Sequence, residues 1–255
     1  VSNGSSERPY TMIQEALDVI ENLDTDMILI QPGTYTENIN IIDLDKTITI
    51  EGLSEDASAV IIDGSALGSV IEIDGGGYST YYIHNLTLQN GLAYSGGGGI
   101  YKSGHADLDL NNVHILDNHV EGSLSSRRGG GIKLANGYYT TEVSLTNCII
   151  SGNTVSGSSS YGGAIDKGSE IFTMDGCVVS NNISNWGSGI YESAANGQIT
   201  ILNSEFLNNE GSEVISAGGQ LNIQNSKFEN NQSSSAVIGT SPSSSGDHIF
   251  IKVDI

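Results

Sequence analysis

Positively charged residues are scarce in this chain of 255 residues, because nine Lys and Arg stand against thirty Asp and Glu, for a formal net charge of −21. So few cations exclude a binding mode that neutralises nucleic-acid phosphates, and they disfavour contact with anionic membranes. No stretch of the sequence is apolar enough to span a bilayer. We therefore expect no nucleic-acid partner and no membrane insertion.

A helical composition is also lacking. Only 15% of the residues are charged, whereas Gly alone accounts for 33 positions, and Ser and Asn are abundant. These residues suit tight turns better than helices. The chain is long for one globular core, but a repeat protein escapes that limit because each unit contacts only its neighbours. A single elongated domain over residues 1–255 fits these observations.

A short phrase recurs along the chain, in which small residues precede an isoleucine. The spacings between successive copies are 32, 33, 25, 25 and 23 residues. The anchoring isoleucines are Ile100, Ile132, Ile165, Ile190, Ile215 and Ile238. Such self-similarity is typical of solenoid architectures.

Each anchor is followed by a segment that alternates between apolar and polar residues and is flanked by Asn. The first Asn column holds Asn85, Asn112, Asn147, Asn203 and Asn225, with Gly176 as the exception. The second column holds Asn118, Asn153, Asn182, Asn209 and Asn231. Alternation with period two indicates strands with one buried face. An Asn column suits a stack of coils, because its amide can bond the equivalent amide one coil away and its backbone tolerates the left-handed conformation.

Short strands that repeat in this way predict a parallel β-solenoid, in which coils stack about 4.8 Å apart and each column of the repeat becomes a ladder in space. Cys148 and Cys177 occupy the same inward position in neighbouring coils. We expect stacked core thiols, and a disulfide between adjacent strands is the alternative in an oxidising compartment.

The two ends of the chain differ from its middle. The leader, residues 1–24, begins without an initiator Met or a secretory hydrophobic segment, so we expect a processed or excised piece of a larger protein. Within it, residues 11–22 have apolar side chains at helical spacing, and Thr11 with Gln14 forms a capping box, which predicts a short helix over the open edge of the first coil. At the other end, residues 249–255 (IFIKVDI) alternate like one more strand. We expect the coils of 25–255 to continue or pair beyond that strand.

The stretch GSSERPYTMIQEALDVIENLDTDMILIQPGTYTENINI, followed by GGGIY, GGAI and the Asn repeats, resembles the right-handed parallel β-helix proteins of the pectin-lyase-like superfamily. More narrowly, it is similar to secreted bacterial and archaeal surface proteins, and GGAI with FLNN and FENN is similar to the repeats of chlamydial polymorphic outer-membrane proteins. The resemblance implies an all-β, right-handed parallel β-helix (solenoid) with a short N-terminal capping helix. It is weak for function, because the superfamily holds lyases, hydrolases, epimerases, tailspikes and autotransporter passengers.

Catalytic patterns of that superfamily are missing from this sequence. There is no adjacent Asp pair for a galacturonan hydrolase, and only Arg8, Arg127 and Arg128 could serve a lyase as the basic arginine. Asp166 with Glu192 is the one acid and base pair that neighbouring coils would bring together, with Lys133 as a third weak candidate. Because Lys167 shares the register of Glu192, a surface ion pair is the simpler interpretation.

Metal and cofactor sites are equally unsupported by the sequence. The five His residues show no ligand spacing, and no column stacks three acids as a calcium cluster would require. We therefore expect no metal site and no cofactor, although the acidity is compatible with calcium.

One constellation is more specific. Arg128, Tyr161 and Trp186 lie four positions before successive anchors, with Tyr94 two positions further back in the preceding coil. Just after the anchors, the outward positions are Tyr101, Lys133, Asp166 and Tyr191. Ladder geometry would align these side chains along one corner, where aromatic faces could stack on sugar rings while Lys133 and Asp166 supply hydrogen bonds. The alternative is that the aromatic residues only shield the glycine-lined corner.

The longest insertions, residues 119–128, 134–142 and 154–161, fall in the same middle coils, and loops on a rigid solenoid are common recognition sites.

Our first hypothesis is an extracellular or cell-surface structural or adhesin-type module without catalytic activity, assembling end to end with copies of itself. The rival hypotheses are a polysaccharide lyase or glycoside hydrolase, and a glycan-binding module without turnover.

Overall fold

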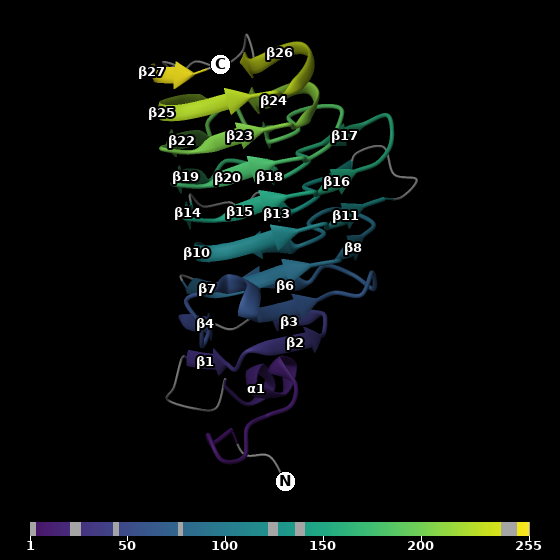
Figure 1. The fold of residues 1–255 in the computed structure, drawn as a ribbon, viewed down its shortest axis with the longest axis vertical. Coiled ribbons are helices and arrows are strands. Elements are labelled where there is room, and N and C mark those ends of the chain that lie inside the picture. The colour runs from purple at the N-terminus through teal and green to yellow at the C-terminus, as the bar shows by residue number, and fades with distance from the viewer. Residues whose placement is uncertain are drawn as a thin grey trace.

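The protein is a stack of β-coils that rise from the N-terminal end to the C-terminal end, as the computed structural model shows (Figure 1). The structure describes residues 4–20, 27–42, 46–75, 79–121, 127–135, 141–240 and 249–254. Between named strands the pairing is parallel throughout, and each strand pairs with its equivalents in the coils before and after it. The predicted all-β parallel solenoid is confirmed.

Four sheets form the sides of the stack. The fourteen-stranded sheet contains β1 (Met27–Ile30), β2 (Gly33–Thr36), β4 (Ile48–Gly52), β5 (Val60–Asp63), β7 (Thr80–Gln89), β10 (Asp107–Leu116), β14 (Glu142–Thr146), β15 (Ile149–Ser151), β19 (Ile171–Asp175), β20 (Val178–Ser180), β22 (Gln198–Leu202), β23 (Glu205–Leu207), β25 (Gln220–Glu229) and β27 (Ile249–Asp254). The eight-stranded sheet contains β3 (Ile39–Ile42), β6 (Ile71–Gly75), β9 (Ile100–Gly104), β13 (Ile132–Leu134), β18 (Ile165–Lys167), β21 (Ile190–Glu192), β24 (Glu210–Ala217) and β26 (Gln232–Thr240). A three-stranded sheet contains β8 (Leu92–Ala93), β11 (His119–Val120) and β16 (Thr154–Val155). A two-stranded sheet contains β12 (Arg127–Arg128) and β17 (Ser160–Tyr161).

The anchoring isoleucines stack on one another through the eight-stranded sheet, as the repeat predicts. The pairing runs from Ile100 to Ile238 through every predicted anchor, and it extends back to Ile71 and Ile39, which the sequence pattern missed. Ile39, Ile71 and Ile100 are all fully buried. The residue directly before the isoleucine is Asn38 or Val70 in these early coils, where the clearest copies of the motif have Gly or Ala.

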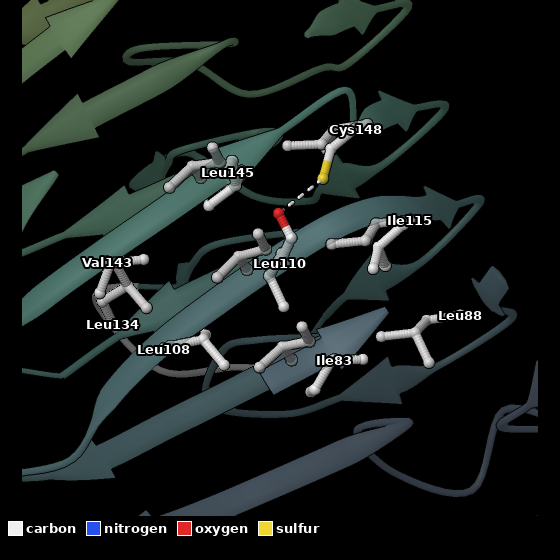
Figure 2. Packing of buried hydrophobic residues seen from close by; sticks show 14 of the residues in the cluster. Ile83, Leu88, Leu108, Leu110, Ile115, Leu134, Val143, Leu145 and Cys148 are labelled. Carbon is white, nitrogen blue, oxygen red and sulfur yellow. Dashed lines mark hydrogen bonds between the residues drawn. The ribbon is translucent and has the colours of Figure 1, made fainter. Parts of the chain in front are cut away.

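The interior of the coils is filled by aliphatic side chains in register. Leu108 and Leu110 lie opposite Val143 and Leu145 of the next coil, and Figure 2 shows these side chains packed in successive layers. Phe206 and Phe228 stack face to face with their ring centroids 4.8 Å apart, which is about the separation of adjacent strands. Burial of this apolar surface is the main stabilising contribution that each coil adds to its neighbour.

The two cysteines occupy the interior position that the repeat predicts. Cys148 and Cys177 are buried and free, and the Cys148 backbone N–H donates to the Cys177 sulfur at 3.4 Å. The Cys148 thiol also donates to the Leu110 carbonyl of the preceding coil at 3.5 Å, the dashed line in Figure 2. The prediction of stacked core thiols is confirmed, and they are not bridged. In the next coil Ser204 continues the column, and its hydroxyl accepts from the Cys177 backbone N–H at 3.1 Å.

The first Asn column forms a bend within the fourteen-stranded sheet. Its members all have positive φ, between 48° and 58°, and Gly176 has a φ of 65° in the same column. Asn and Gly are the residues that adopt this left-handed conformation with least strain. The column therefore turns each coil from one side to the next.

The second Asn column forms a buried amide ladder at the next corner. The side-chain amide of Asn118 donates to Asn153, that of Asn153 to Asn182, and that of Asn182 to Asn209, each at 3.0 Å. Asn209 donates in the same way to Asn231 at 3.1 Å. Residues of this column do not have positive φ. The residue directly before each of them adopts the left-handed conformation instead, as Asp117 does before Asn118. The second column thus keeps only the amide ladder, whereas members of the first column show both expected properties, since Asn112 Nδ2 also donates to Asn85 Oδ1 at 2.9 Å.

The N-terminal helix α1 (Ile13–Ile20) lies at the first coil, against β1 and β3 (Figure 1). Its predicted start at Thr11 and its predicted capping box are wrong. The backbone N–H groups of Ile13 and Gln14 donate to the two carboxylate oxygens of Glu37 at 2.9 Å and 3.1 Å, so a residue distant in sequence caps the helix. Positions 21 and 22 of the expected helix lie outside the described residues.

The same helix covers the edge of the eight-stranded sheet. The Gln14 side chain accepts from the Asn40 backbone N–H at 2.8 Å and donates to the Asn40 carbonyl at 3.1 Å, which satisfies the open side of β3. At the opposite end, β27 pairs in parallel with β25, as the alternation of residues 249–255 predicts. Throughout the described ranges, no helix is long and apolar enough to cross a membrane.

The amide ladder generates the first prediction. We expect Asn153→Ala to lower the free energy of unfolding by about 3 kcal/mol, because its neighbours Asn118 and Asn182 would lose buried hydrogen-bond partners. Thermal unfolding followed by circular dichroism measures this change. The matched control is Asn147→Gly in the bend column, where Gly176 already serves and the cost is expected to be below about 1 kcal/mol. Equal losses in the two variants would contradict a special role for the ladder.

Candidate functional site

Two outward-facing columns meet at the corner that the sequence singles out. In the first column, Arg128 pairs with Tyr161, and Tyr161 with Trp186, in successive coils. In the second column, Lys133 lies between Tyr101 and Asp166. Asp166 is in turn paired with Tyr191. The predicted register of both columns is confirmed, with Gly96 opposite Arg128 and Tyr94 two positions before Gly96.

The Arg128 guanidinium group holds the centre of this corner together. It lies 4.6 Å from the ring centroid of Tyr161 and 5.4 Å from that of Tyr191, and these two rings are 4.7 Å apart. Its Nη1 donates to Asp166 Oδ1 at 3.1 Å. Cation–π contact and a charge-assisted hydrogen bond together fix the aromatic rings in place. We name Arg128, Lys133, Tyr161, Asp166 and Tyr191 the corner cluster.

Asp166 is buried beneath these side chains. Burial raises the pKa of its carboxyl group to about 6, although the positive charges of Arg128 and Lys133 act in the opposite direction. Burial likewise lowers the pKa of Lys133 and raises the pKa of Tyr191. The Asp166 carboxyl group is thus enclosed at the centre of the corner cluster and accepts a hydrogen bond from Arg128.

Lys167 and Glu192 form the predicted ion pair, but its predicted place on the surface is wrong, because both side chains point into the coil and are fully buried. The register is as predicted, and Lys167 Nζ contacts Glu192 Oε1 and donates to the Gly168 carbonyl at 2.9 Å. The Gly219 N–H donates to Glu192 Oε2 at 2.7 Å. Successive side chains of a strand point to opposite faces, so Asp166 faces outward and cannot share a substrate with Glu192 as acid and base.

A groove of about 440 Å³ lies beside the corner cluster, on the coils that follow it. Trp186 lies at its border with a second groove of about 640 Å³, and 42% of the Trp186 surface is exposed. The first groove is lined by Tyr161, Trp186, Tyr191, Glu192, Ser193, Ala195, Glu213, Ser216, Ala217, Gly218, Gly239 and Thr240. Three of the predicted binding residues therefore form one wall of a groove, and the remaining lining is small or hydroxyl-bearing apart from two glutamates.

The other predicted binding residues lie outside the groove. Tyr94 is 63% exposed and does not line it, and Tyr101 is half-buried beside Glu72, with which it pairs in the eight-stranded sheet. Arg128 contacts the Tyr161 and Tyr191 rings of that wall, and Lys133 and Asp166 lie close to Arg128 without lining the groove. Parts of the predicted recognition loops, residues 122–126 and 136–140, lie outside the described residues.

Glu213 is the groove residue that sequence reasoning missed. Two positions before the stacked isoleucine, successive coils carry Gly98, Gly130, Gly163, Ser188 and then Glu213. The corner has no space for a side chain at the glycines of this column, since a Cβ at Gly130 would lie 2.4 Å from the Gly163 carbonyl oxygen. Beside Glu213 the pairing of β24 with β26 is irregular, because its register shifts between Gly211 and Glu213. The sequence did hold a signal for Glu213, because the small residues that precede the isoleucine in earlier copies are replaced by EVI in this copy.

Metal binding finds no support at this corner or elsewhere in the part of the chain that the structure describes. No group of three or more His, Cys, Asp or Glu residues is arranged to hold an ion. His84 pairs with Asp109 at 3.1 Å, and His119 with Thr154 and Ser156, as ordinary hydrogen-bonded side chains.

Comparison with known proteins agrees with this architecture. The family model described as a right handed beta helix region matches residues 55–249. A curated relative, the "Cell surface glycoprotein" of Methanothermus fervidus, is 30% identical over 122 residues, which is 48% of this chain and 18% of that protein. The chain therefore spans less than a fifth of the length of that relative.

Solved structures of pectin methylesterases share the fold. The enzyme from Aspergillus niger superposes with a TM-score of 0.57 at 16% identity, covering 98% of this chain and 83% of that structure. The carrot enzyme gives a TM-score of 0.55 at 14% identity, covering 96% and 86%. At such identities the likeness shows the fold alone.

The buried carboxyl group generates the second prediction. Its pKa of about 6 in the folded protein exceeds the value of about 3.9 in an unfolded chain, so the folded state binds the proton more tightly. Asp166 therefore lowers the free energy of unfolding progressively as the pH rises from about 4 to about 6. At higher pH the loss no longer grows. We expect the stability of Asp166→Asn relative to wild type to increase by about 2 to 3 kcal/mol across this window.

Chemical denaturation of both proteins at a series of pH values measures this difference. The other acidic groups of the chain contribute equally to both proteins and cancel in the comparison. A difference that stays constant with pH would show that Asp166 titrates normally.

Proposed function

The chain belongs to the right-handed β-helix family, and from this premise we propose that it is a structural, adhesin-type module of a cell-surface protein that binds saccharides in the groove beside Trp186. The rigid stack supplies the structural part of this function. The aromatic wall formed by Tyr161, Trp186 and Tyr191 is the observation that carries the binding part.

An extracellular location is favoured by two properties of the chain. The match to a protein named as a cell surface glycoprotein supports it, over the 122 residues that the two share. The net charge of −21 is also suited to a solvated module outside the cell. Fold alone would not select this function, because one fold hosts many activities.

The groove has the chemistry that saccharide binding needs. The faces of aromatic rings pack against the C–H faces of sugars, while hydroxyl groups such as those of Ser193, Ser216 and Thr240 exchange hydrogen bonds with the sugar hydroxyls. The corner cluster fixes the tyrosine rings before any ligand arrives, which reduces the ordering cost of binding. Exposure of nearly half of Trp186 leaves its ring available for contact.

The enzyme alternative has less support. Glycoside hydrolysis uses two carboxyl groups on opposite sides of the scissile bond. Among the described residues that line the groove, Glu192 is committed to its ion pair with Lys167, which leaves Glu213 alone. We therefore propose binding without turnover.

The third prediction concerns the aromatic wall. We expect the double substitution Tyr161→Ala with Trp186→Ala to weaken saccharide binding at least tenfold, because each lost ring contact costs about 1 kcal/mol or more. A glycan array followed by calorimetry on the best ligand measures the loss. Tyr94→Ala is the matched control, because it removes an exposed aromatic residue that does not line the groove. Unchanged binding in the double variant would remove this groove from consideration.

The fourth prediction separates binding from catalysis. We expect the protein to release neither reducing ends nor unsaturated uronides from a panel of polysaccharides. If product is released, its loss in Glu213→Gln would assign the activity to the groove, and its loss in Asp166→Ala would favour the rival enzyme hypothesis at the corner cluster. Either result would overturn the proposal of a non-catalytic module.

A further inference from the structure

Glu213 is held with its carboxylate at the groove. Its backbone carbonyl accepts from the Ser188 N–H at 2.9 Å and from the Ser188 hydroxyl at 3.2 Å, which fixes the main chain. The side chain runs along Gly239 of the next coil, where a Cβ would lie 2.8 Å from Glu213 Cγ. The absence of a side chain at Gly239 therefore makes room for the carboxylate.

One oxygen of this carboxylate lacks a partner. Oε2 of Glu213 is enclosed and makes no hydrogen bond within the described part of the chain. Burial raises the pKa of this carboxyl group, with no opposing contribution from a nearby cation. An enclosed acceptor without a donor is costly, so the partly exposed Glu213 side chain gains when its carboxylate turns into the groove and meets a donor on a ligand.

The cations near the groove are already engaged elsewhere. Arg128 and Lys133 surround Asp166, and Lys167 contacts Glu192 inside the coil. No Lys or Arg occurs among the described residues that line the groove. A ligand with a carboxylate would find no positive partner there and would meet the charge of Glu213, whereas a ligand with an ammonium group would find both a carboxylate and aromatic faces.

We propose that the groove selects saccharides that carry a free amine, and that Glu213 determines this specificity by pairing with the ammonium group while Trp186 and Tyr191 contact the sugar ring. This inference rests on the proposed saccharide-binding function and names its ligand class. The neutral N-acetylated sugar and the uronic acid are the competitors that the site rejects, the first for lack of a charge and the second by repulsion.

The test compares three probes of equal length by calorimetry: oligomers of glucosamine, of N-acetylglucosamine and of galacturonic acid. We expect wild type to bind the glucosamine oligomer most tightly and the galacturonic acid oligomer least. Glu213→Gln is expected to weaken binding of the glucosamine oligomer about tenfold and to leave the N-acetylated oligomer nearly unchanged, because it removes the charge while retaining the shape.

A matched control separates specific pairing from the general attraction of an acidic protein for a cationic ligand. Glu205→Gln changes the net charge by the same amount at an exposed position of β23, on a different sheet from the groove strands β21, β24 and β26. It is expected to leave all three affinities close to those of wild type. Equal losses in Glu213→Gln and Glu205→Gln would reduce the effect to net charge and overturn the inference.

Failure of the inference and failure of the proposed function give different results. If Trp186→Ala weakens binding but wild type does not prefer the amine, or Glu213→Gln does not reduce that preference, the inference fails and the saccharide groove stands. If none of the three probes binds and no glycan on the array depends on Trp186, both fail. Thermal unfolding of each variant verifies that the coil is intact, and Glu213→Gln should not lower its melting temperature, since no hydrogen bond to Oε2 is lost.

Discussion

Parallel pairing between consecutive coils is the constraint on which the rest of this structure depends. Each residue of a strand is held opposite its equivalent in the coils before and after it, so a position in the repeat is also a position in space. A side chain unsuited to its column disturbs two neighbours at once. The corners therefore accept only residues that meet a specific backbone demand, while the loops between them vary in length.

The same constraint explains why different corners use different chemistry. One bend needs a left-handed residue and takes Asn or Gly. The next corner encloses backbone polar groups and takes the Asn ladder, whose amide donors also reach carbonyls of the preceding coil, as Asn153 does to Ile115 at 2.9 Å. The third corner brings backbones so close together at Gly98, Gly130 and Gly163 that it takes glycine there, and the next two coils accept Ser188 and then Glu213. Recognition chemistry enters the solenoid where that packing demand is relaxed.

Much of this arrangement could be predicted from the sequence, because columns are visible as repeats. The parallel solenoid, both Asn columns, the stacked thiols and the order of Arg128, Tyr161 and Trp186 followed from spacing alone. Register does not reveal how far a long side chain turns or what covers it. The capping of α1 by Glu37 and the groove beside Trp186 depend on contacts between segments outside the repeated phrase, so they needed the structure. The burial of Lys167 with Glu192 instead follows from strand alternation, two positions after a buried isoleucine, and their charges led to the opposite prediction.

The scarcity of cations also shapes the molecule from within. Lys102 and Lys167 are buried inside the coil, Lys46 donates to the Ile20 carbonyl at the end of α1 at 2.7 Å, and Arg128 is stacked on tyrosine rings. Burying a charge is costly unless it is paired, so these few cations are placed where they satisfy carboxylates and carbonyls that packing has already enclosed. Among the described Lys and Arg residues, only Arg8 and Lys227 are exposed, so acidic residues dominate the outer surface. A groove on such a surface repels anions from a distance as well as in contact, so the internal use of cations and the proposed selection of amine-bearing ligands have one electrostatic cause.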